Sequence, residues 1–178
     1  MRIAIIGTRG IPANYGGFET YAEELAPRLN ALCNTVTVSC HSRDDQLPDY
    51  KGVALKYSQF KKASNPIRFY FETLRQAVKE NDVLLIAGVG GAIFYPFLRR
   101  KKAVFVTNID GIESKRSKWS YLKKLYLKIG EIMAVRFSNY IIADSSGIKE
   151  YIAKTYGKTP AEVVQLEYGA DLNTFFSK

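Results

Sequence analysis

Short runs of branched apolar residues alternate along the chain with longer stretches in which apolar residues recur at the helical period. Such alternation is typical of βαβ units around a parallel sheet. The apolar runs predict seven strands, at residues 2–6, 35–40, 52–57, 83–87, 103–107, 140–143 and 162–166. The periodic stretches predict four helices, at residues 18–32, 66–80, 117–137 and 147–156. We therefore expect an α/β fold, a Rossmann-like doubly wound parallel sheet of about seven strands in the order 3-2-1-4-5-6-7, with helices on both faces.

The periodicity also predicts which side of two helices faces the core. In the first helix the apolar face consists of Tyr21, Leu25, Leu29 and Leu32. In the third helix the inward residues are Leu122, Leu125, Ile129, Ile132 and Met133, with Lys123, Lys124 and Lys128 facing outward. The polar run over residues 41–51 predicts a surface loop.

Ligands of doubly wound sheets bind outside the carboxyl ends of the strands, where the strand order reverses. Here that point lies between the first and fourth predicted strands. The first strand is followed by Gly7 and Gly10, and the fourth by Gly88, Gly90 and Gly91. Because glycine allows the backbone to approach a ligand closely, we expect these two loops to form the walls of a binding crevice.

Gly16 and Gly17 stand at the start of the first helix, where unpaired N–H groups and the helix dipole favour a phosphate or diphosphate. The alternative is structural: paired glycines allow a tight loop, and Glu19 complements the dipole of the first turn. The segment does not match the G-x-G-x-x-G dinucleotide fingerprint, and the second strand ends in Cys40-His41 rather than a ribose-binding acid. A nicotinamide cofactor is therefore not expected.

Asp110 directly follows the fifth predicted strand and precedes Gly111. From the floor of the crevice its carboxylate would orient or deprotonate a substrate hydroxyl. The alternative, which position alone favours, is an Asp-Gly turn whose side chain bonds its own backbone.

The composition places the chain among globular proteins. Its 178 residues are 47% hydrophobic and 24% charged, enough for one domain with its own core. No apolar stretch approaches the roughly 20 residues that span a bilayer, and the apolar run after Arg2 is too short for a signal peptide. We therefore expect a cytoplasmic protein. Cys33, Cys40 and the single histidine His41 cannot complete a zinc site, so we expect two reduced, buried thiols and no metal.

Positive charge is concentrated in one segment. Lysine and arginine number 26 against 17 acidic residues, for a net charge of +9, and residues 99–128 hold ten basic and two acidic residues. Such a field attracts phosphates, nucleic acid or anionic lipid. Lys115, Arg116 and Lys118 oppose the dipole of the third helix, which indicates compensation by an anion; a solvated basic loop is the alternative.

Three motifs carry a resemblance to a known family. They are MRIAIIGTRGIP at residues 1–12, YGGFET at residues 15–20, and NIDGIE at residues 108–113 with the following Lys115-Arg116 and Lys118-Trp119. Over essentially its whole length the chain resembles the N-terminal domain of bacterial family 4 glycosyltransferases. The subgroup that it resembles includes rhamnosyltransferases of capsule and O-antigen assembly.

The resemblance implies a GT-B fold, two Rossmann-like domains facing a cleft, with residues 1–178 as the N-terminal, acceptor-side half. The donor-binding C-terminal domain would lie outside these residues, and the isolated half would be inactive. The implied activity is hexosyl transfer, with rhamnose as a candidate, from a nucleoside-diphosphate sugar with retention of configuration and without a cofactor. The implied acceptor is a polyprenyl-diphosphate-linked sugar or a glycan at the inner face of the plasma membrane, whose anionic surface the basic segment would contact.

The resemblance also assigns site residues by position. Gly16 and Gly17 would contact the donor diphosphate, and Asp110 would lie near the reacting hydroxyl. The other cleft residues, on the acceptor side, would be Arg9, Tyr15, Glu19, Gly90, Glu113, Lys115 and Arg116.

Two other classes of function remain open. A non-catalytic module that binds nucleotides or phosphosugars is compatible with the same fold, because fold does not determine function. Nucleic-acid binding is compatible with the basic segment alone. No helix-turn-helix or RNA-binding motif is present in the sequence, so we expect no nucleic-acid partner.

Overall fold

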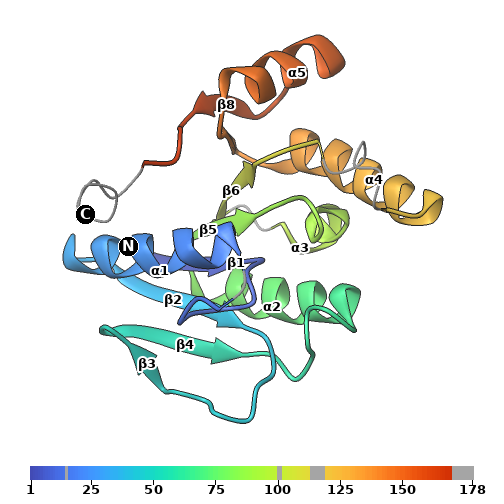
Figure 1. Ribbon diagram of the computed structural model, residues 1–178. Coiled ribbons are helices and arrows are strands. Elements are labelled where there is room, and N and C mark those ends of the chain that lie inside the picture. Colours follow the sequence, from blue (N-terminus) through green and yellow to red (C-terminus); the bar gives the residue numbers. More distant parts are fainter. Residues whose placement is uncertain (15, 100–101, 113–118, 170–178) are drawn as a thin grey trace, which may run out of the picture.

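The backbone forms one twisted sheet in the computed structural model, which describes residues 1–14, 16–99, 102–112 and 119–169 (Figure 1). The strands are β1 (Arg2–Ile6), β2 (Thr35–Cys40), β3 (Asp49–Tyr50), β4 (Val53–Tyr57), β5 (Val83–Ala87), β6 (Val104–Ile109), β7 (Tyr140–Ala143) and β8 (Glu162–Gln165). Their order in space is β3-β4-β2-β1-β5-β6-β7-β8, and only the β3–β4 pair is antiparallel. The seven predicted strands and their order are therefore confirmed.

The short strand β3 corrects the predicted surface loop over residues 41–51. Asp49 pairs with Ala54 and Tyr50 with Val53 in a hairpin. The two residues between them, 51 and 52, have φ angles of 51° and 77°, the backbone of a tight hairpin turn. Because the pair is Lys-Gly rather than the usual Asn-Gly or Asp-Gly, the sequence carries only a weak signal for this edge strand.

Helices cover both faces of the sheet, as predicted, but unequally. On one face α1 (Gly17–Ala31) packs its Ala22 and Ala26 against Ile3 and Ile5 of β1. On the other face lie α2 (Pro66–Glu80), the 3-10 turn η1 (Ala92–Phe94), α3 (Tyr95–Leu98), α4 (Tyr121–Phe137) and α5 (Ser146–Tyr156). The sequence pattern predicts neither η1 nor α3. None of the described helices combines the length and apolar character needed to cross a membrane.

The core-facing sides of α1 and α4 agree with the prediction only in part: Tyr21, Leu25, Leu29 and Met133 pack against the core, as predicted. Leu122, Leu125 and Ile129, predicted to point inward, are 76%, 47% and 42% exposed, and Leu32 is 71% exposed. The residues that α4 buries instead are Leu127, Gly130, Glu131, Ala134 and Val135. Small residues such as Gly130 and Ala134 let the helix backbone approach its neighbours closely. Leu122, Leu125 and Ile129 are consequently left at the surface, whereas Tyr126, Met133 and Phe137 pack against the core.

Gly130 determines how closely α4 packs. A Cβ built there would lie 2.5 Å from the carbonyl oxygen of Val89, in the loop after β5. We expect Gly130→Ala to lower the free energy of unfolding by about 1–3 kcal/mol, because a methyl group in this contact forces two backbones apart. Urea denaturation measures the change.

The control for this variant is Gly147→Ala in α5. No atom lies within 4 Å of a Cβ built at Gly147, and alanine has the higher helix propensity. Stability should therefore stay constant or rise. A Gly130→Ala protein as stable as Gly147→Ala would show that α4 can move away from Val89 without cost.

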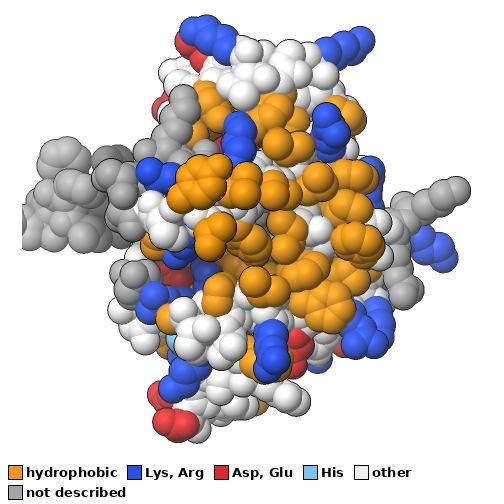
Figure 2. Space-filling view, turned by 90° about the vertical axis from the view of Figure 1, so that its right-hand side faces the viewer, with side chains coloured by type: hydrophobic (Ala, Val, Ile, Leu, Met, Phe, Trp, Pro, Cys, Tyr) orange, Lys and Arg blue, Asp and Glu red, His pale blue; other side chains and the backbone are white. Residues whose placement is uncertain are grey.

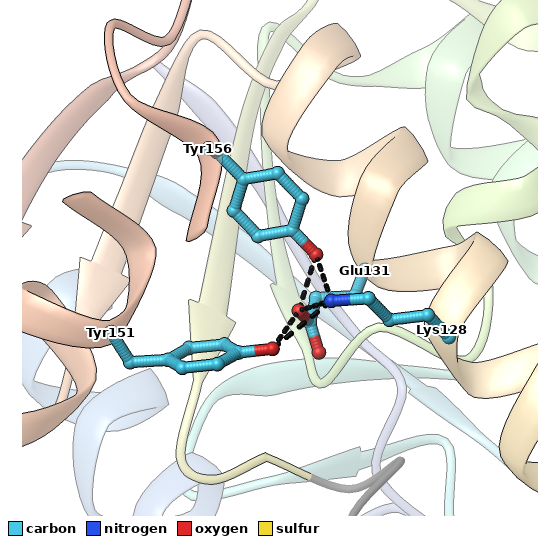
Figure 3. Close-up of polar contacts among 4 residues, drawn as sticks. All are labelled: Lys128, Glu131, Tyr151 and Tyr156. Atoms are coloured by element: carbon cyan, nitrogen blue, oxygen red, sulfur yellow. Dashed lines mark hydrogen bonds and ion pairs between the residues drawn. The ribbon is translucent and has the colours of Figure 1, made fainter. Parts of the chain in front are cut away.

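A buried carboxylate joins α4 to α5 (Figure 3). Glu131 is 3% exposed, and its Oε1 accepts hydrogen bonds from Lys128 Nζ (2.8 Å), the Tyr151 hydroxyl (2.8 Å) and the Tyr156 hydroxyl. Lys128 Nζ also donates to the hydroxyl oxygens of Tyr151 and Tyr156, at 3.0 and 2.7 Å. Burial lowers the pKa of Lys128, but its hydrogen bonds to Glu131 and the two tyrosines outweigh burial and raise it. The ammonium therefore stays charged beside the carboxylate.

The two cysteines lie in different environments, which corrects the expectation of two buried thiols. Cys33 is exposed after α1, whereas Cys40 is buried at the end of β2, and both are free. Burial raises the pKa of the Cys40 thiol. Cys40 therefore serves the core as a small apolar side chain.

Candidate functional site

The loop after β1 lies against the end of β5, where the strand order reverses. Gly7 has a φ of 94°, and a Cβ there would lie 2.5 Å from the carbonyl oxygen of Ala87. Gly10 has a φ of 108°, and its Cβ would lie 2.9 Å from Cys40 Cα. Both positions thus require glycine because the backbone passes close to a neighbouring strand, independently of any ligand.

Gly90, predicted to line the acceptor cleft, is buried against α2. A Cβ there would lie 2.7 Å from the ring of Tyr70. The Gly90 carbonyl accepts a hydrogen bond from the hydroxyl of Tyr126 in α4. Burial raises the pKa of Tyr126 to about 12, so this hydroxyl stays protonated and can donate. Packing is sufficient to explain Gly90, and its place in the cleft stays a prediction.

The first turn of α1 is open at Gly17. Gly16 is the N-cap in extended conformation, and its carbonyl accepts the N–H groups of Glu19 (3.0 Å) and Thr20 (3.1 Å). Gly17 is exposed, and no atom lies within 4 Å of a Cβ built there. The N–H groups that begin a helix have no partner within it, so they are available to an anion. The fold itself does not require glycine at position 17.

Two acids of α1 hold the loop that precedes it. Glu19 is 4% exposed, and its Oε1 accepts the Arg9 N–H at 2.7 Å. One turn later, Glu23 Oε2 accepts the Ala13 N–H at 2.8 Å. Glu19 thus positions the loop through the backbone of Arg9, in addition to complementing the helix dipole. The roles predicted for Arg9 and Glu19 in an acceptor cleft stay predictions.

Asp110 lies just beyond β6, near Tyr168, which is close to the last described residue. Asn108 Nδ2 donates to the Tyr168 hydroxyl at 2.8 Å, and the rings of Tyr168 and Tyr21 meet edge to face at 5.1 Å. Burial raises the pKa of Tyr168; the Asn108 hydrogen bond opposes this, and the negative charges of Asp110 and Asp144 reinforce it. Carboxylates from the ends of β6 and β7 therefore share an environment with this hydroxyl.

Sequence reasoning identified Asp110 but none of its neighbours as a site residue. Asp144 and Tyr168 each follow a predicted strand, a signal that could have found them. Tyr21 carries no such signal, because its helical spacing predicts a core residue. Asn108 is 1% exposed, and its Oδ1 is buried without a hydrogen-bond partner in the described structure.

Four of the predicted site residues lie outside the described residues. They are Tyr15, Glu113, Lys115 and Arg116. Their roles stay predictions.

The sheet order and the helix arrangement are those of one Rossmann-like half of a GT-B fold. The chain is similar over 97% of its length to sucrose-phosphate synthase from Thermosynechococcus elongatus, with a TM-score of 0.71 and 15% identity, and covers 49% of that chain. It is similar over 92% of its length to UDP-N-acetylglucosamine 2-epimerase from Rickettsia bellii (TM-score 0.54, 12% identity, 43% of that chain). It is similar over 96% of its length to UGT89C1 of Arabidopsis thaliana complexed with UDP (TM-score 0.54, 10% identity, 53% of that chain). The chain thus spans roughly half the length of these structures.

The chain belongs to the family described as "Domain of unknown function (DUF1972)", whose model matches residues 1–171. A comparison with curated proteins gave no match.

Proposed function

We propose that the chain is the N-terminal, acceptor-side half of a retaining glycosyltransferase of GT-B fold. The donor is a nucleoside-diphosphate sugar, with rhamnose as the candidate sugar. The acceptor is a polyprenyl-diphosphate-linked sugar or a glycan in cell-surface polysaccharide synthesis. The observation that supports this best is the start of α1, where an exposed glycine leaves the first N–H groups open to a diphosphate beside the carboxyl edge of the sheet. Two of the similar solved structures bear UDP in their names, which agrees with such a ligand.

The proposed chemistry follows from where charge develops. Transfer releases a nucleoside diphosphate, and the first-turn N–H groups of α1 stabilise its growing negative charge. Glu19 and Glu23 hold the loop before α1 by its backbone, so that these donors are preorganised. Asp110 orients the acceptor hydroxyl or takes its proton. A C-terminal half supplies most contacts to the nucleotide and sugar, and positioning across the cleft supplies much of the rate.

Gly17→Val tests the donor contact, with Gly17→Ala as the smaller change. Because no atom lies within 4 Å of a Cβ at this position, we expect both variants to unfold within about 0.5 kcal/mol of wild type. The valine side chain should hinder binding of the diphosphate. The KM for the nucleotide sugar should rise about tenfold, because this corresponds to the loss of one charge-assisted hydrogen bond. If Gly17→Val had the same KM for the nucleotide sugar as wild type, the donor diphosphate would not bind at the start of α1.

The activity is tested on the complete gene product that carries this chain. It is incubated with labelled dTDP-rhamnose, and in parallel with UDP-glucose and UDP-N-acetylglucosamine, together with a polyprenyl-diphosphate-linked sugar. Glycosylated lipid with the anomeric configuration of the donor would support the proposal. Binding of the nucleotide sugar without transfer would identify a non-catalytic module, and an epimerised sugar nucleotide would identify an epimerase.

We further propose that the protein lies at the anionic inner face of the plasma membrane. Figure 2 shows a broad apolar surface, bordered by lysine and arginine side chains, on the side of the molecule where α2, α3 and α4 lie. The exposed large apolar side chains of α3 and α4 are Phe97, Tyr121, Leu122, Leu125 and Ile129. Lys123, whose Nζ lies 3.2 Å from the centre of the Trp119 ring, and Lys124 belong to the same helix region. Apolar side chains flanked by lysines are typical of helices that bind anionic membrane surfaces.

Vesicle co-sedimentation tests this contact. We expect the double variant Leu122→Ser/Leu125→Ser to bind phosphatidylglycerol-rich vesicles more than about tenfold less tightly, because two leucines no longer enter the bilayer interface. Lys123→Glu/Lys124→Glu should lose binding to these vesicles in the same assay, and Leu32→Ser, an equally exposed leucine after α1, should bind like wild type. If both double variants bound the vesicles as tightly as wild type, the membrane contact would be refuted. The apolar surface would then contact another part of the enzyme.

A further inference from the structure

Cationic side chains surround the chain's single histidine at the carboxyl edge of the sheet. Arg9 follows β1, His41 and Arg43 follow β2, and Lys61 and Lys62 follow β4. These three strands are parallel neighbours, in the order β4-β2-β1. Because the carboxyl ends of parallel strands meet at one edge, the three loops lie together. Sequence reasoning identified only Arg9 among these residues as a site residue.

Hydrogen bonds tie the three loops to one another. They run from the His41 N–H to the Arg9 carbonyl (3.0 Å), from the Ser42 N–H to the Phe60 carbonyl (3.2 Å), and from Lys62 Nζ to the Gly7 carbonyl. Arg43 lies 5.8 Å from the centre of the Tyr57 ring, which restricts its guanidinium. The three loops that carry these cations are therefore held together by the fold.

His41 carries a buried polar atom that the described protein leaves unpaired. Its Nδ1 is buried without a hydrogen-bond partner among the described residues. Burial lowers the pKa of His41, and the positive charges of Arg43, Arg9 and Lys61 lower it further, against the opposing charge of Glu19. A neutral imidazole therefore lies in a positive field. An unpaired buried polar atom is costly, and the positive field around it is unfavourable unless an anion offsets it.

We propose that these loops form a phosphoryl-binding subsite, in which a phosphate group is held by Arg9, Arg43 and Lys61 beside the His41 ring. Phosphate matches such a cluster, since its oxygens accept charge-assisted hydrogen bonds from guanidinium and ammonium groups and carry the opposite charge. The buried Glu19 is already bound to the Arg9 N–H and belongs to the wall of the subsite. This identification rests on the proposed function. Since the donor diphosphate is assigned there to the start of α1, the group that occupies this subsite is a phosphoryl group of the acceptor.

Because His41 is the only histidine in the sequence, its imidazole resonances report on the subsite without assignment. We expect inorganic phosphate to raise the pKa of His41 in a saturable manner, because a phosphate dianion stabilises the imidazolium. Sodium chloride at equal ionic strength should not do so. Arg43→Gln and Lys61→Gln should each weaken phosphate binding about tenfold. Arg136→Gln and Lys149→Gln, exposed cations on α4 and α5, are the matched controls and should bind phosphate like wild type.

Two further probes distinguish the sources of the phosphoryl group. Glucose 1-phosphate represents a phosphosugar, and farnesyl diphosphate represents a polyprenyl diphosphate; the one that saturates the His41 shift at lower concentration identifies the acceptor class. A His41 resonance that responds to phosphate no more than to chloride, or equal affinities in Arg43→Gln and Arg136→Gln, would overturn the subsite. The measurement needs no sugar transfer. Phosphate binding at His41 in a protein without transferase activity would therefore refute only the proposed function.

Discussion

Replacing Asp110 by alanine is expected to lower kcat of the proposed transferase by about 10²- to 10⁴-fold, the usual contribution of a positioned acid or base. Asp110 follows β6 at the carboxyl edge, where a substrate hydroxyl can be reached, and it lies near the Tyr168 hydroxyl. Steady-state kinetics with the complete gene product measure the effect. The KM for the nucleotide sugar should change little, because the proposed binding place of the donor diphosphate is the start of α1 rather than the end of β6.

Asp110→Asn separates the two roles open to this carboxylate. The amide keeps the shape and can still orient a hydroxyl, but it cannot accept a proton at neutral pH. Near-normal turnover in Asp110→Asn would therefore indicate orientation, and a loss equal to that of alanine would indicate proton transfer. Asp49→Ala, an exposed aspartate on the edge strand β3, is the control for loss of an acidic side chain. Unchanged kcat in Asp110→Ala, with a normal melting temperature, would exclude Asp110 from the reaction.

Replacing Glu131 by alanine is expected to lower the free energy of unfolding by about 3 kcal/mol, because it leaves an ammonium and two phenol hydroxyls without their shared acceptor. For a domain of this size the melting temperature should fall by about 6–12 °C. Glu131 lies in α4, and Tyr151 and Tyr156 lie in α5, so the loss falls on the contact between these helices. Differential scanning calorimetry measures both quantities.

Glu150→Ala is the matched control in α5. Its ion pair with Lys154, at 3.3 Å, has side chains that are 66% and 79% exposed, so its removal should cost less than about 0.5 kcal/mol. Glu131→Gln retains one acceptor oxygen and should fall between wild type and Glu131→Ala. Equal losses in Glu131→Ala and Glu150→Ala would show that the buried cluster contributes nothing beyond a surface pair.

The elements were predictable because their signals are local. The branched run at Val83–Ala87 predicts a buried strand, and Pro66 after Asn65 predicts the start of α2, both with the boundaries observed. Ser145 precedes the last helix and caps it, since its Oγ accepts the Ile148 N–H at 3.4 Å. Leu122, Leu125 and Ile129 of α4 were wrongly predicted to face the core, because spacing alone does not show that Gly130 provides the close contact.

The candidate site was predictable only where it follows strand ends. Asp110 was found because residues just after a parallel strand lie at the ligand-binding edge. The Tyr21–Tyr168 contact was not predictable, because it joins the first helix to a segment that follows the last strand. The surroundings of His41 were equally hidden, since Arg9 and Lys61 come from loops far away in the sequence.

Alone, the sequence determined the alternation of strands and helices, the strand order, and the strand end at which Asp110 lies, because periodicity and glycine or proline punctuation act over a few residues. Tertiary structure decided which side of α4 is buried, which glycines are required by a neighbouring strand, and which cations surround His41. Those outcomes depend on how closely two backbones approach in space. That distance is set by the packing of side chains from distant segments, which no local pattern contains.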